Sequence, residues 1–487
     1  MIVMEMRLPV LAHPGMVLEG LARNPALPPA LLRRLFAHPP ARDEAVMWRA
    51  DLTEELAGEI IALGDPMLTH ALACNRSLPA GVKRTLAAAP DPAVRSALAA
   101  HEEGIPRELF ERFAGDPAPE VREEAARNGS TPDDLRARLA QDPHPEVRSA
   151  LGQFWTDAPE AVRRSLLTDP DPTVRAAACA THFRGGPAPV PPADLHPALL
   201  ADPVTRAGVV RHLALDAGTA RRLAADENED VRAAVAGHPE LPADLRDALG
   251  RDPDALVRAE VFYRRDTPDA LRAEIHANLQ AGYRRSRDTP QDATEDDDFC
   301  LVAVLDMHHR HVAWPAEAPL DHADSPYPCF RRSVATADAL PPGIVARLLD
   351  DEDHRVRATM AARIPDLDPA VAERLERTHV HERKRPGRPA DHITFPPAML
   401  RRFAGDPEPG MRVLAPRDPG LPAELAARLA ADPDPLVRIA VAGHRSLPLP
   451  ALFALLADQD EDIAIAAARS PRLPVDAMEE LLTRVRL

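Results

Sequence analysis

Six histidine and cysteine residues in one part of the chain could bind a metal ion. They are His308, His309, His311, His322, Cys300 and Cys329. Imidazole and thiolate groups are ligands that zinc prefers. No two of these residues form a recognised ligand pair such as C-x-x-C or H-E-x-x-H. The group indicates either a metal site or the polar end of a helix with incidental histidines, and we favour the second interpretation.

A basic segment at residues 378–392 could bind an anionic surface. Its charged side chains include Arg383, Lys384, Arg385 and Arg388. Such a cluster suits a phosphate group or an acidic protein surface. No aromatic residue lies within the cluster to stack on bases, which argues against single-stranded nucleic acid. We favour a solvated loop that balances the acidic chain, then contact with an acidic protein, then contact with nucleic acid.

The sequence contains no recognised motif of enzymatic catalysis. It has no phosphate-binding loop, no G-x-S-x-G elbow and no dinucleotide-binding fingerprint. Carboxylates are plentiful, yet nothing marks a pair of them for acid–base chemistry. We therefore expect a non-catalytic protein that needs no cofactor.

The three tryptophans lie where the pattern of the chain is irregular. Trp314 belongs to an irregular segment, where an aromatic side chain can anchor a partner or can pack internally. Trp48 and Trp155 are expected to fill gaps between repeated units. Trp314 is therefore the aromatic candidate for partner binding.

A repeat of about 26 residues must position all of these side chains. The units share an anchor residue in the same register, and this anchor is mostly apolar. The anchors are Val17, Leu68, Val94, Val121, Val147, Val174, Thr205, Val231, Val257, Phe330, Val356, Met411, Val437 and Ile463. One weaker unit is expected with its anchor near Arg42, and another is expected to end in residues 395–400.

Each unit predicts two short helices. An Asp five residues before the anchor, such as Asp432, is expected to start the first helix, because Asp caps free N–H groups. An Asn or His seven residues after the anchor, such as Asn128, is expected to end that helix or to bond the turn. A following Leu-Pro pair starts the second helix, whose apolar face recurs at i and i+4, as at Leu135 and Leu139. No strand pattern is present.

Arginines recur one residue after the anchor. They are Arg95, Arg122, Arg148, Arg175, Arg206, Arg232, Arg258, Arg331, Arg357, Arg412 and Arg438. Such a row could track phosphates along a nucleic acid. It largely coincides with the row of aspartates, however, so pairing between adjacent units is the simpler interpretation.

Charge and cysteine content narrow the class of protein. The net charge of −17 argues against a dedicated duplex-DNA binder, which needs a positive field. The four cysteines are scattered, which fits a reducing, cytoplasmic setting. No apolar stretch approaches the 18 residues of a membrane span, and residues 1–12 do not have the pattern of a signal peptide.

Residues 432–457, with the sequence DPDPLVRIAVAGHRSLPLPALFALLA, resemble the bacterial leucine-rich repeat variant family. They are also similar to HEAT-like repeats, which share the Asp and Val-Arg pattern. The resemblance extends from about Val17 to Leu482 with interruptions, and it implies an architecture rather than an activity. Some members of the variant family carry a cysteine-rich iron–sulfur segment at the N-terminus; we do not carry this feature over, because no cysteine precedes Cys74 in this sequence.

The sequence therefore predicts an all-α protein, an α-solenoid of about fifteen two-helix repeats. Residues 1–275 and 329–487 would form two arrays, separated by an irregular insertion at 276–328 that holds an acidic run and the histidines. We expect a cytoplasmic scaffold or adaptor that binds a protein or peptide along its concave face and insertions. The alternatives are a HEAT-like nucleic-acid-binding or base-repair protein and a metal-binding accessory protein. The oligomeric state stays open.

Overall fold

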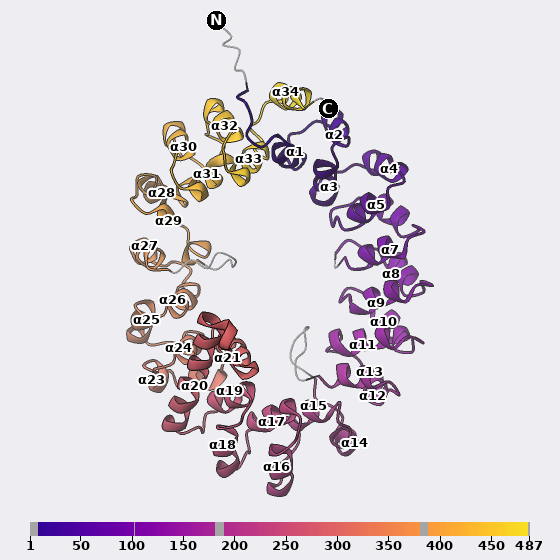
Figure 1. Cartoon of the computed structure of the whole chain (residues 1–487), viewed down its shortest axis with the longest axis vertical. Helices are drawn as coiled ribbons and strands as arrows, with labels where there is room; N and C mark the ends of the chain where they lie inside the picture. The colour runs from indigo at the N-terminus through magenta and orange to yellow at the C-terminus, as the bar shows by residue number, and fades with distance from the viewer. Residues whose placement is uncertain (1–7, 102, 181–188, 380–387, 486–487) are drawn as a thin grey trace, which may run out of the picture. The chain divides into compact units, whose positions relative to one another are not determined.

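A computed structural model describes the chain except residues 1–7, 102, 181–188, 380–387 and 486–487. The described residues form α-helices and short 3-10 helices and contain no strand. Most α-helices follow one another in pairs that are joined by short turns and stacked in sequence order (Figure 1). The expected all-α solenoid of two-helix repeats is thus confirmed.

The chain divides into two compact units. Unit 1 combines Met1–Leu86 with Leu349–Leu487, and unit 2 is Ala87–Leu348. The helices of unit 1 are α1 (Pro14–Ala22), α2 (Pro29–Leu35), α3 (Pro39–Trp48), α4 (Glu54–Ala62), α5 (Pro66–Ala73), α6 (Ala80–Leu86), α26 (His354–Ala361), α27 (Pro369–Arg377), α28 (Pro397–Phe403), α29 (Pro409–Arg412), α30 (Ala423–Ala430), α31 (Pro435–Ala442), α32 (Leu449–Leu456), α33 (Glu461–Ala468) and α34 (Val475–Arg484).

Unit 2 contains the remaining pairs and the large insertion. Its helices are α7 (Pro92–Ala99), α8 (Arg107–Phe113), α9 (Pro119–Arg127), α10 (Asp133–Leu139), α11 (Pro145–Phe154), α12 (Glu160–Leu167), α13 (Pro172–Ala178), α14 (His196–Ala201), α15 (Arg206–Val210), α16 (Ala217–Ala224), α17 (Glu229–Ala236), α18 (Ala243–Leu249), α19 (Ala255–Tyr263), α20 (Asp269–Asp288), α21 (Glu295–Met307), α22 (Ala313–Glu317), α23 (Pro319–His322), α24 (Pro328–Val334) and α25 (Pro342–Leu349), which ends at the boundary.

The first helix of a pair starts later than we expected. Asp432 does not cap α31; the N-cap is Asp434, whose side chain accepts hydrogen bonds from the N–H groups of Leu436 and Val437. Asp432 instead accepts the N–H of Asp434 in the preceding turn, at 3.0 Å. The expectation was wrong because this earlier Asp has a second task between repeats.

That second task is an ion pair with the arginine that follows the preceding anchor. Arg95 donates to both carboxylate oxygens of Asp116 at 2.7 Å, and both side chains are at least nine-tenths buried. The guanidinium also donates to the Ala89 carbonyl of its own repeat at 2.8 Å. Equivalent pairs are Arg122–Asp142, Arg148–Asp169, Arg175–Asp202, Arg206–Asp226, Arg232–Asp252, Arg412–Asp432 and Arg438–Asp458. The predicted pairing between adjacent units is confirmed at these positions.

A second set of inter-repeat bonds comes from the residue seven positions after the anchor. Asn128 donates to the carbonyls of Ala99 and His101 at 2.8 and 2.7 Å, 29 and 27 residues earlier. Its carbonyl oxygen accepts the N–H of Ser130 in the turn, at 2.9 Å. The turn bond was expected, whereas the bonds to the preceding repeat were not. They satisfy free carbonyls at the end of the neighbouring first helix.

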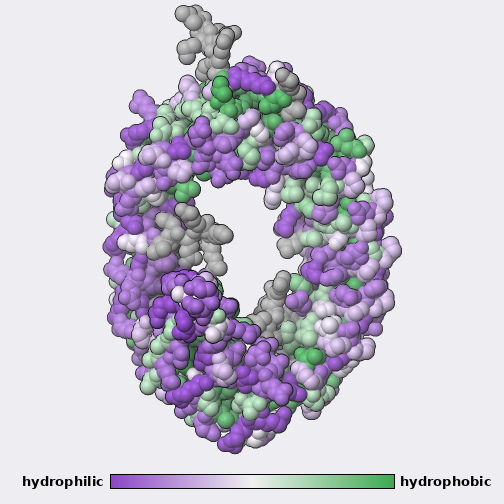
Figure 2. Space-filling view, viewed as in Figure 1, coloured by the Kyte–Doolittle hydropathy of each residue, from purple (hydrophilic) through white to green (hydrophobic). Residues whose placement is uncertain are grey.

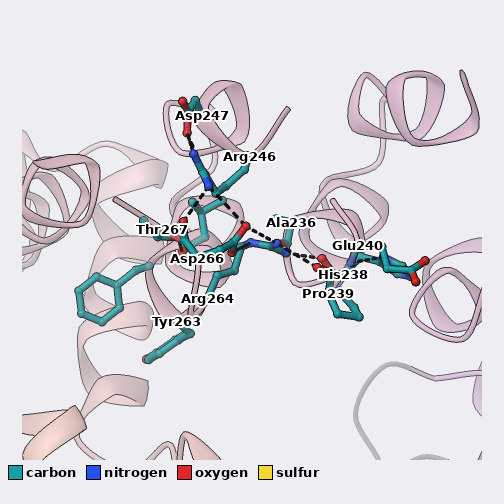
Figure 3. Close-up of polar contacts among 12 residues, drawn as sticks. Ala236, His238, Pro239, Glu240, Arg246, Asp247, Tyr263, Arg264, Asp266 and Thr267 are labelled. Carbon is teal, nitrogen blue, oxygen red and sulfur yellow. Dashed lines mark hydrogen bonds and ion pairs between the residues drawn. The ribbon is translucent and has the colours of Figure 1, made fainter. Parts of the chain in front are cut away.

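Histidine and arginine fill the same position elsewhere, as Figure 3 shows. His238 bonds the Leu213 carbonyl at 2.8 Å. One repeat later, Arg264 donates to the carbonyls of Ala236 and His238, while Asp266 binds the same guanidinium at 2.8 Å. Different side chains therefore make one structural bond, because each has a donor that reaches back by one repeat.

The insertion at 276–328 is helical and shares the core of unit 2. It begins inside α20, which is longer than the other second helices, and α21 packs along it. At Gly282 of α20, a Cβ would lie 2.5 Å from the sulfur of Cys300 in α21, so only glycine permits this approach. Val304 of α21 is buried in the same cluster as Phe262 of α19 and Phe330 of α24.

The acidic run of the insertion forms the first turn of α21. Thr294 and Asp297 make a reciprocal capping box, and Arg285 of α20 donates to Asp297 at 2.6 Å. The hydrogen bond from Arg285, together with the N–H of Thr294, lowers the pKa of Asp297 to about 2. Asp296 pairs with Arg258 at 2.9 Å, in place of the aspartate of a following repeat. The run thus joins the insertion to the array.

Within unit 1 the N-terminal and C-terminal repeats pack on each other. Helix α1 lies against α33, and Asn24 donates to the carbonyls of Ala468 and Ser470, both at 2.8 Å. These acceptors lie where a preceding repeat would supply them. Arg484 also donates to the carbonyls of Leu8 and Pro9 at 2.8 and 2.7 Å. Unit 1 is consequently one continuous array in space, from residue 349 through the C-terminal repeat to α1 and on to residue 86.

Candidate functional site

The candidate metal ligands do not converge. His311 bonds the Thr336 hydroxyl at 2.7 Å, and His322 lies edge-on to the Trp314 ring. The His308 and His309 rings have centroids 6.5 Å apart and are nearly perpendicular. Within the described part of the chain, no three or more His, Cys, Asp or Glu side chains are arranged to hold a metal ion.

The two candidate cysteines lie in the core rather than at a surface. Cys300 and Cys329 are both buried and free of disulfide bonds. Burial raises the pKa of each thiol to about 11, so both are protonated at neutral pH. A thiol in that state is a poor metal ligand, since the thiolate is the ligating form.

Trp314 supports the packing of the insertion. Its indole N–H donates to the Tyr263 carbonyl at 2.8 Å. Its ring packs on the Phe330 ring, with 5.0 Å between the two ring centroids. The guanidinium of Arg272 lies 5.4 Å from the ring centroid. The side chain is partly buried against the core of unit 2, which leaves less of it for a partner.

Of the four basic candidates in the segment 378–392, the structure describes Arg388. Arg383, Lys384 and Arg385 lie outside the described residues. Arg388 is described, and its Nε donates to the buried Glu376 carboxylate at 2.6 Å. The same guanidinium donates to the Gly410 carbonyl at 2.9 Å. Arg388 therefore ties the segment to the array.

A groove of about 500 Å³ opens on the first-helix face of unit 2, the surface formed by the first helices of successive pairs. Its floor is the exposed side of α17, with the small residues Ala233, Ala234 and Gly237. Arg211, which follows α15, borders one side. The other side is built by Glu260 of α19 and by the end of the insertion. Figure 2 shows that the surface around α21 is mostly hydrophilic.

Charged side chains dominate the walls of this groove. Arg310 binds both carboxylate oxygens of Glu260 at 2.7 and 2.8 Å and lies 4.2 Å from the Tyr263 ring centroid. Asp306 accepts a hydrogen bond from the Tyr263 hydroxyl at 3.3 Å. Arg211 is exposed as a residue, yet burial of its guanidinium by the surrounding chain lowers its pKa. An arginine remains charged at neutral pH despite such a shift.

Trp48 is the exposed aromatic residue of the first-helix face in unit 1. It ends α3, and 60% of its surface is accessible to solvent. The Arg23 guanidinium lies 5.1 Å from its ring centroid and also pairs with Glu44. The expectation that Trp48 fills a gap between repeats was wrong, because the side chain lies outside the core. Trp155, by contrast, is 3% exposed and fills such a gap.

The repeat that forms the groove floor matches a known family of repeats. Residues 229–254 match the leucine rich repeat variant family. A comparison with curated proteins finds no significant match. The matched segment spans α17, the turn after it and α18, which together make one period of the array.

In the repeat that matches the leucine rich repeat variant family, some side chains bond the neighbouring repeats and others line the groove. Its Arg232 binds Asp252 at 2.9 Å, and its His238 bonds the preceding repeat. Asp230, Ala233 and Ala234 of the same repeat line the groove. In this matched repeat, the residues that bond the neighbouring repeats and the residues that line the groove are therefore different.

Sequence reasoning missed the groove. Arg211 and Arg310 are far apart in the chain, and Asp230 looks like any first-turn acidic residue. The sequence did hold one signal for the groove. Arg310 lies among His308, His309 and His311, which were considered as metal ligands.

Proposed function

We propose that this chain is a non-catalytic, cytoplasmic scaffold that holds a protein or peptide partner. The partner binds on the first-helix face, with the insertion at 276–328 and the basic segment at 378–392 as additional determinants. A stacked array suits this task because it offers a long surface on a rigid frame. The four cysteines are all free, which supports a reducing compartment. None of the described helices is long and apolar enough to cross a membrane.

The observation that carries the proposal is the exposed indole of Trp48 beside Arg23. Tryptophan and arginine are the residue types most often found at the energetic centres of protein interfaces. An indole that is 60% exposed gains a large apolar contact when a partner covers it. Because Trp48 ends the first helix α3, this contact would lie on the first-helix face.

Neither alternative function gains a specific observation. The arginine row that could track phosphates is largely engaged by aspartates of adjacent repeats, as at Arg122 and Arg232. Those guanidiniums are not free to bind a nucleic-acid backbone.

Affinity capture from the host lysate tests the proposal. Wild-type protein, Trp48→Ala and Leu63→Ala are each used as bait, with and without nuclease, and captured proteins are identified by mass spectrometry. Leu63 is a matched control, because it is 57% exposed but follows the second helix α4. We expect a partner that survives nuclease, is lost with Trp48→Ala and is kept with Leu63→Ala. Capture that disappears with nuclease, or that ignores Trp48→Ala, would contradict the proposal.

A further inference from the structure

One guanidinium in the groove of unit 2 has no side chain of the described residues at ion-pair distance, although the nearby Glu260 carboxylate acts on it electrostatically. Arg310, on one wall, is held by both oxygens of Glu260. Arg211, on the opposite side, makes no side-chain hydrogen bond or ion pair with any residue that the structure describes. It carries five N–H donors in a planar fork that matches a carboxylate. The groove therefore presents an unused site for an anionic group.

The end of the groove beside Arg211 is kept open by a glycine. Gly237 ends α17 as Arg211 ends α15, and these two first helices pack side by side. A Cβ at Gly237 would lie 3.2 Å from a carboxylate oxygen of Glu260. Any larger side chain would extend into the space in front of these charges. The small residue thus leaves room for a ligand group.

The other end of the groove has the opposite charge. Asp230 is the second residue of α17, and Gly237 directly follows that helix. Seven residues of α-helix span about 10 Å at 1.5 Å per residue. An extended polypeptide covers that distance in about three residues. The Asp230 carboxylate accepts no side-chain hydrogen bond from the described residues, so it too can bind a ligand.

We propose that this groove binds a polypeptide segment that presents a carboxylate to Arg211 and N–H donors or a cationic side chain to Asp230. The carboxylate comes from an acidic side chain or from a C-terminus. This inference rests on the proposed scaffold function and names the chemistry of one partner. A peptide suits the groove better than a compact metabolite, because the two charged ends are separated by the length of α17.

Peptide selection by phage display tests the proposal with random octapeptides as the probe. Peptides are selected on wild-type protein after depletion on Arg211→Gln, and their affinities are measured by fluorescence anisotropy. Each selected peptide is also made with its Asp or Glu replaced by Asn or Gln, and with its C-terminus amidated. Arg221→Gln is the control, since Arg221 is an exposed arginine of the second helix α16.

We expect that removing the peptide carboxylate weakens binding at least tenfold, and that Arg211→Gln has the same effect on the parent peptide. The two changes together should cost no more than either alone. Arg221→Gln should change affinity less than twofold. Arg211→Glu should instead prefer peptides with Lys at the position of the carboxylate. The proposal fails if no selected peptide depends on both Arg211 and a carboxylate.

Two further results separate the possible outcomes. Succinate and glutamate are titrated up to millimolar concentration. If either binds wild-type protein with the same affinity as the peptides, and Arg211→Gln abolishes that binding, then the ligand is a small carboxylate and the peptide inference is wrong. If a Trp48-dependent partner is captured from lysate but no carboxylate peptide is selected, this inference fails while the scaffold function stands. Loss of both results would reject the scaffold function itself.

Discussion

At the scale of single residues, the array uses a few polar side chains to join one repeat to the next. Most guanidiniums of the arginine row bond an aspartate of the next repeat and carbonyls of their own repeat, as Arg122 does with Asp142 and the Asp116 carbonyl. Because these pairs are buried, removing one partner leaves an unpaired charge and costs about 3–5 kcal/mol. An exposed pair contributes about 0–1 kcal/mol.

The Asp142 pair predicts a specific dependence of stability on pH. Burial alone would raise the pKa of Asp142, but hydrogen bonds from Arg122 and from the His144 N–H outweigh it, so the pKa lies below its usual value of 3.8. The folded state thus gains stability above pH 3.8 and loses it as pH falls through the lower folded-state pKa. We expect Asp142→Asn to be less stable than wild type at pH 7, and we expect this difference to shrink progressively as the pH falls below 3.8.

Urea unfolding followed by circular dichroism between pH 7 and pH 2 measures this difference. Asp133→Asn is the control, because Asp133 is 72% exposed and pairs with Arg136 at the surface. A stability difference for Asp142→Asn that stays constant over the whole pH range would show that the ion pair is not the cause.

At the scale of helices, much of the fold follows from the repeat, and the exceptions have physical causes. The buried positions Leu135 and Leu139 on the second helix are where the i, i+4 pattern placed them. Two expectations failed. Asp432 is not a helix cap, because Asp serves two purposes in the repeat. The Asp three residues before the anchor caps the first helix, and the Asp five residues before it pairs with an arginine of the preceding repeat. Trp48 is exposed, because apolar character alone does not specify a core position.

The candidate site was harder to predict than the fold. The groove joins Arg211, Asp230 and Arg310, which are brought together only by stacking and by the path of the insertion. The residue types of one repeat do not indicate which side chains of other repeats and of the insertion will lie next to them. The histidines and cysteines attracted attention because of their types, yet packing directs them apart.

The insertion forms one groove wall only if α20 and α21 approach closely. Gly282→Ala would place a Cβ 2.5 Å from the Cys300 sulfur, so we expect α21 to be displaced and its amides to exchange faster by at least tenfold. Gly58→Ala in α4 is the control, because nothing lies within 4 Å of its Cβ position. Alanine there should stabilise the helix by about 0.5–1 kcal/mol.

Hydrogen–deuterium exchange with peptide resolution reports both effects. If the amides of residues 295–307 keep their protection in Gly282→Ala, then α21 does not depend on its close approach to α20. The helix pair would then not be what holds this wall of the groove in place.

At the scale of the whole chain, the two terminal repeats of unit 1 cover each other's outer sides. A terminal repeat normally needs a polar outer face, because one apolar side has no neighbour. Here α1 covers α33, and Asn24 bonds the C-terminal repeat as Asn75 bonds the repeat before it. Unit 1 therefore depends on contact between segments more than 440 residues apart in sequence.

Two glycines of α1 allow this junction to be tested. Gly20→Ala would place a Cβ 2.5 Å from the Ile465 carbonyl oxygen, whereas Gly15→Ala meets nothing within 4 Å. Overpacking of this kind costs about 1–3 kcal/mol. We expect Gly20→Ala to lower the melting temperature and to increase proteolysis near both termini, and Gly15→Ala to do neither. Equal melting curves for the two variants would contradict the packing of α1 on α33.

The most direct test of the scaffold function is site-specific photo-crosslinking in the host cell. A benzophenone amino acid is introduced singly at Trp48, Met67 or Leu436, which are exposed positions of first helices. For comparison it is introduced at Leu63, which directly follows the second helix α4, or at Val475, which begins the second helix α34. Our account predicts a crosslinked partner from the first-helix positions only. Crosslinks from the second-helix positions alone, or the same partner from both sets, would contradict binding on the first-helix face.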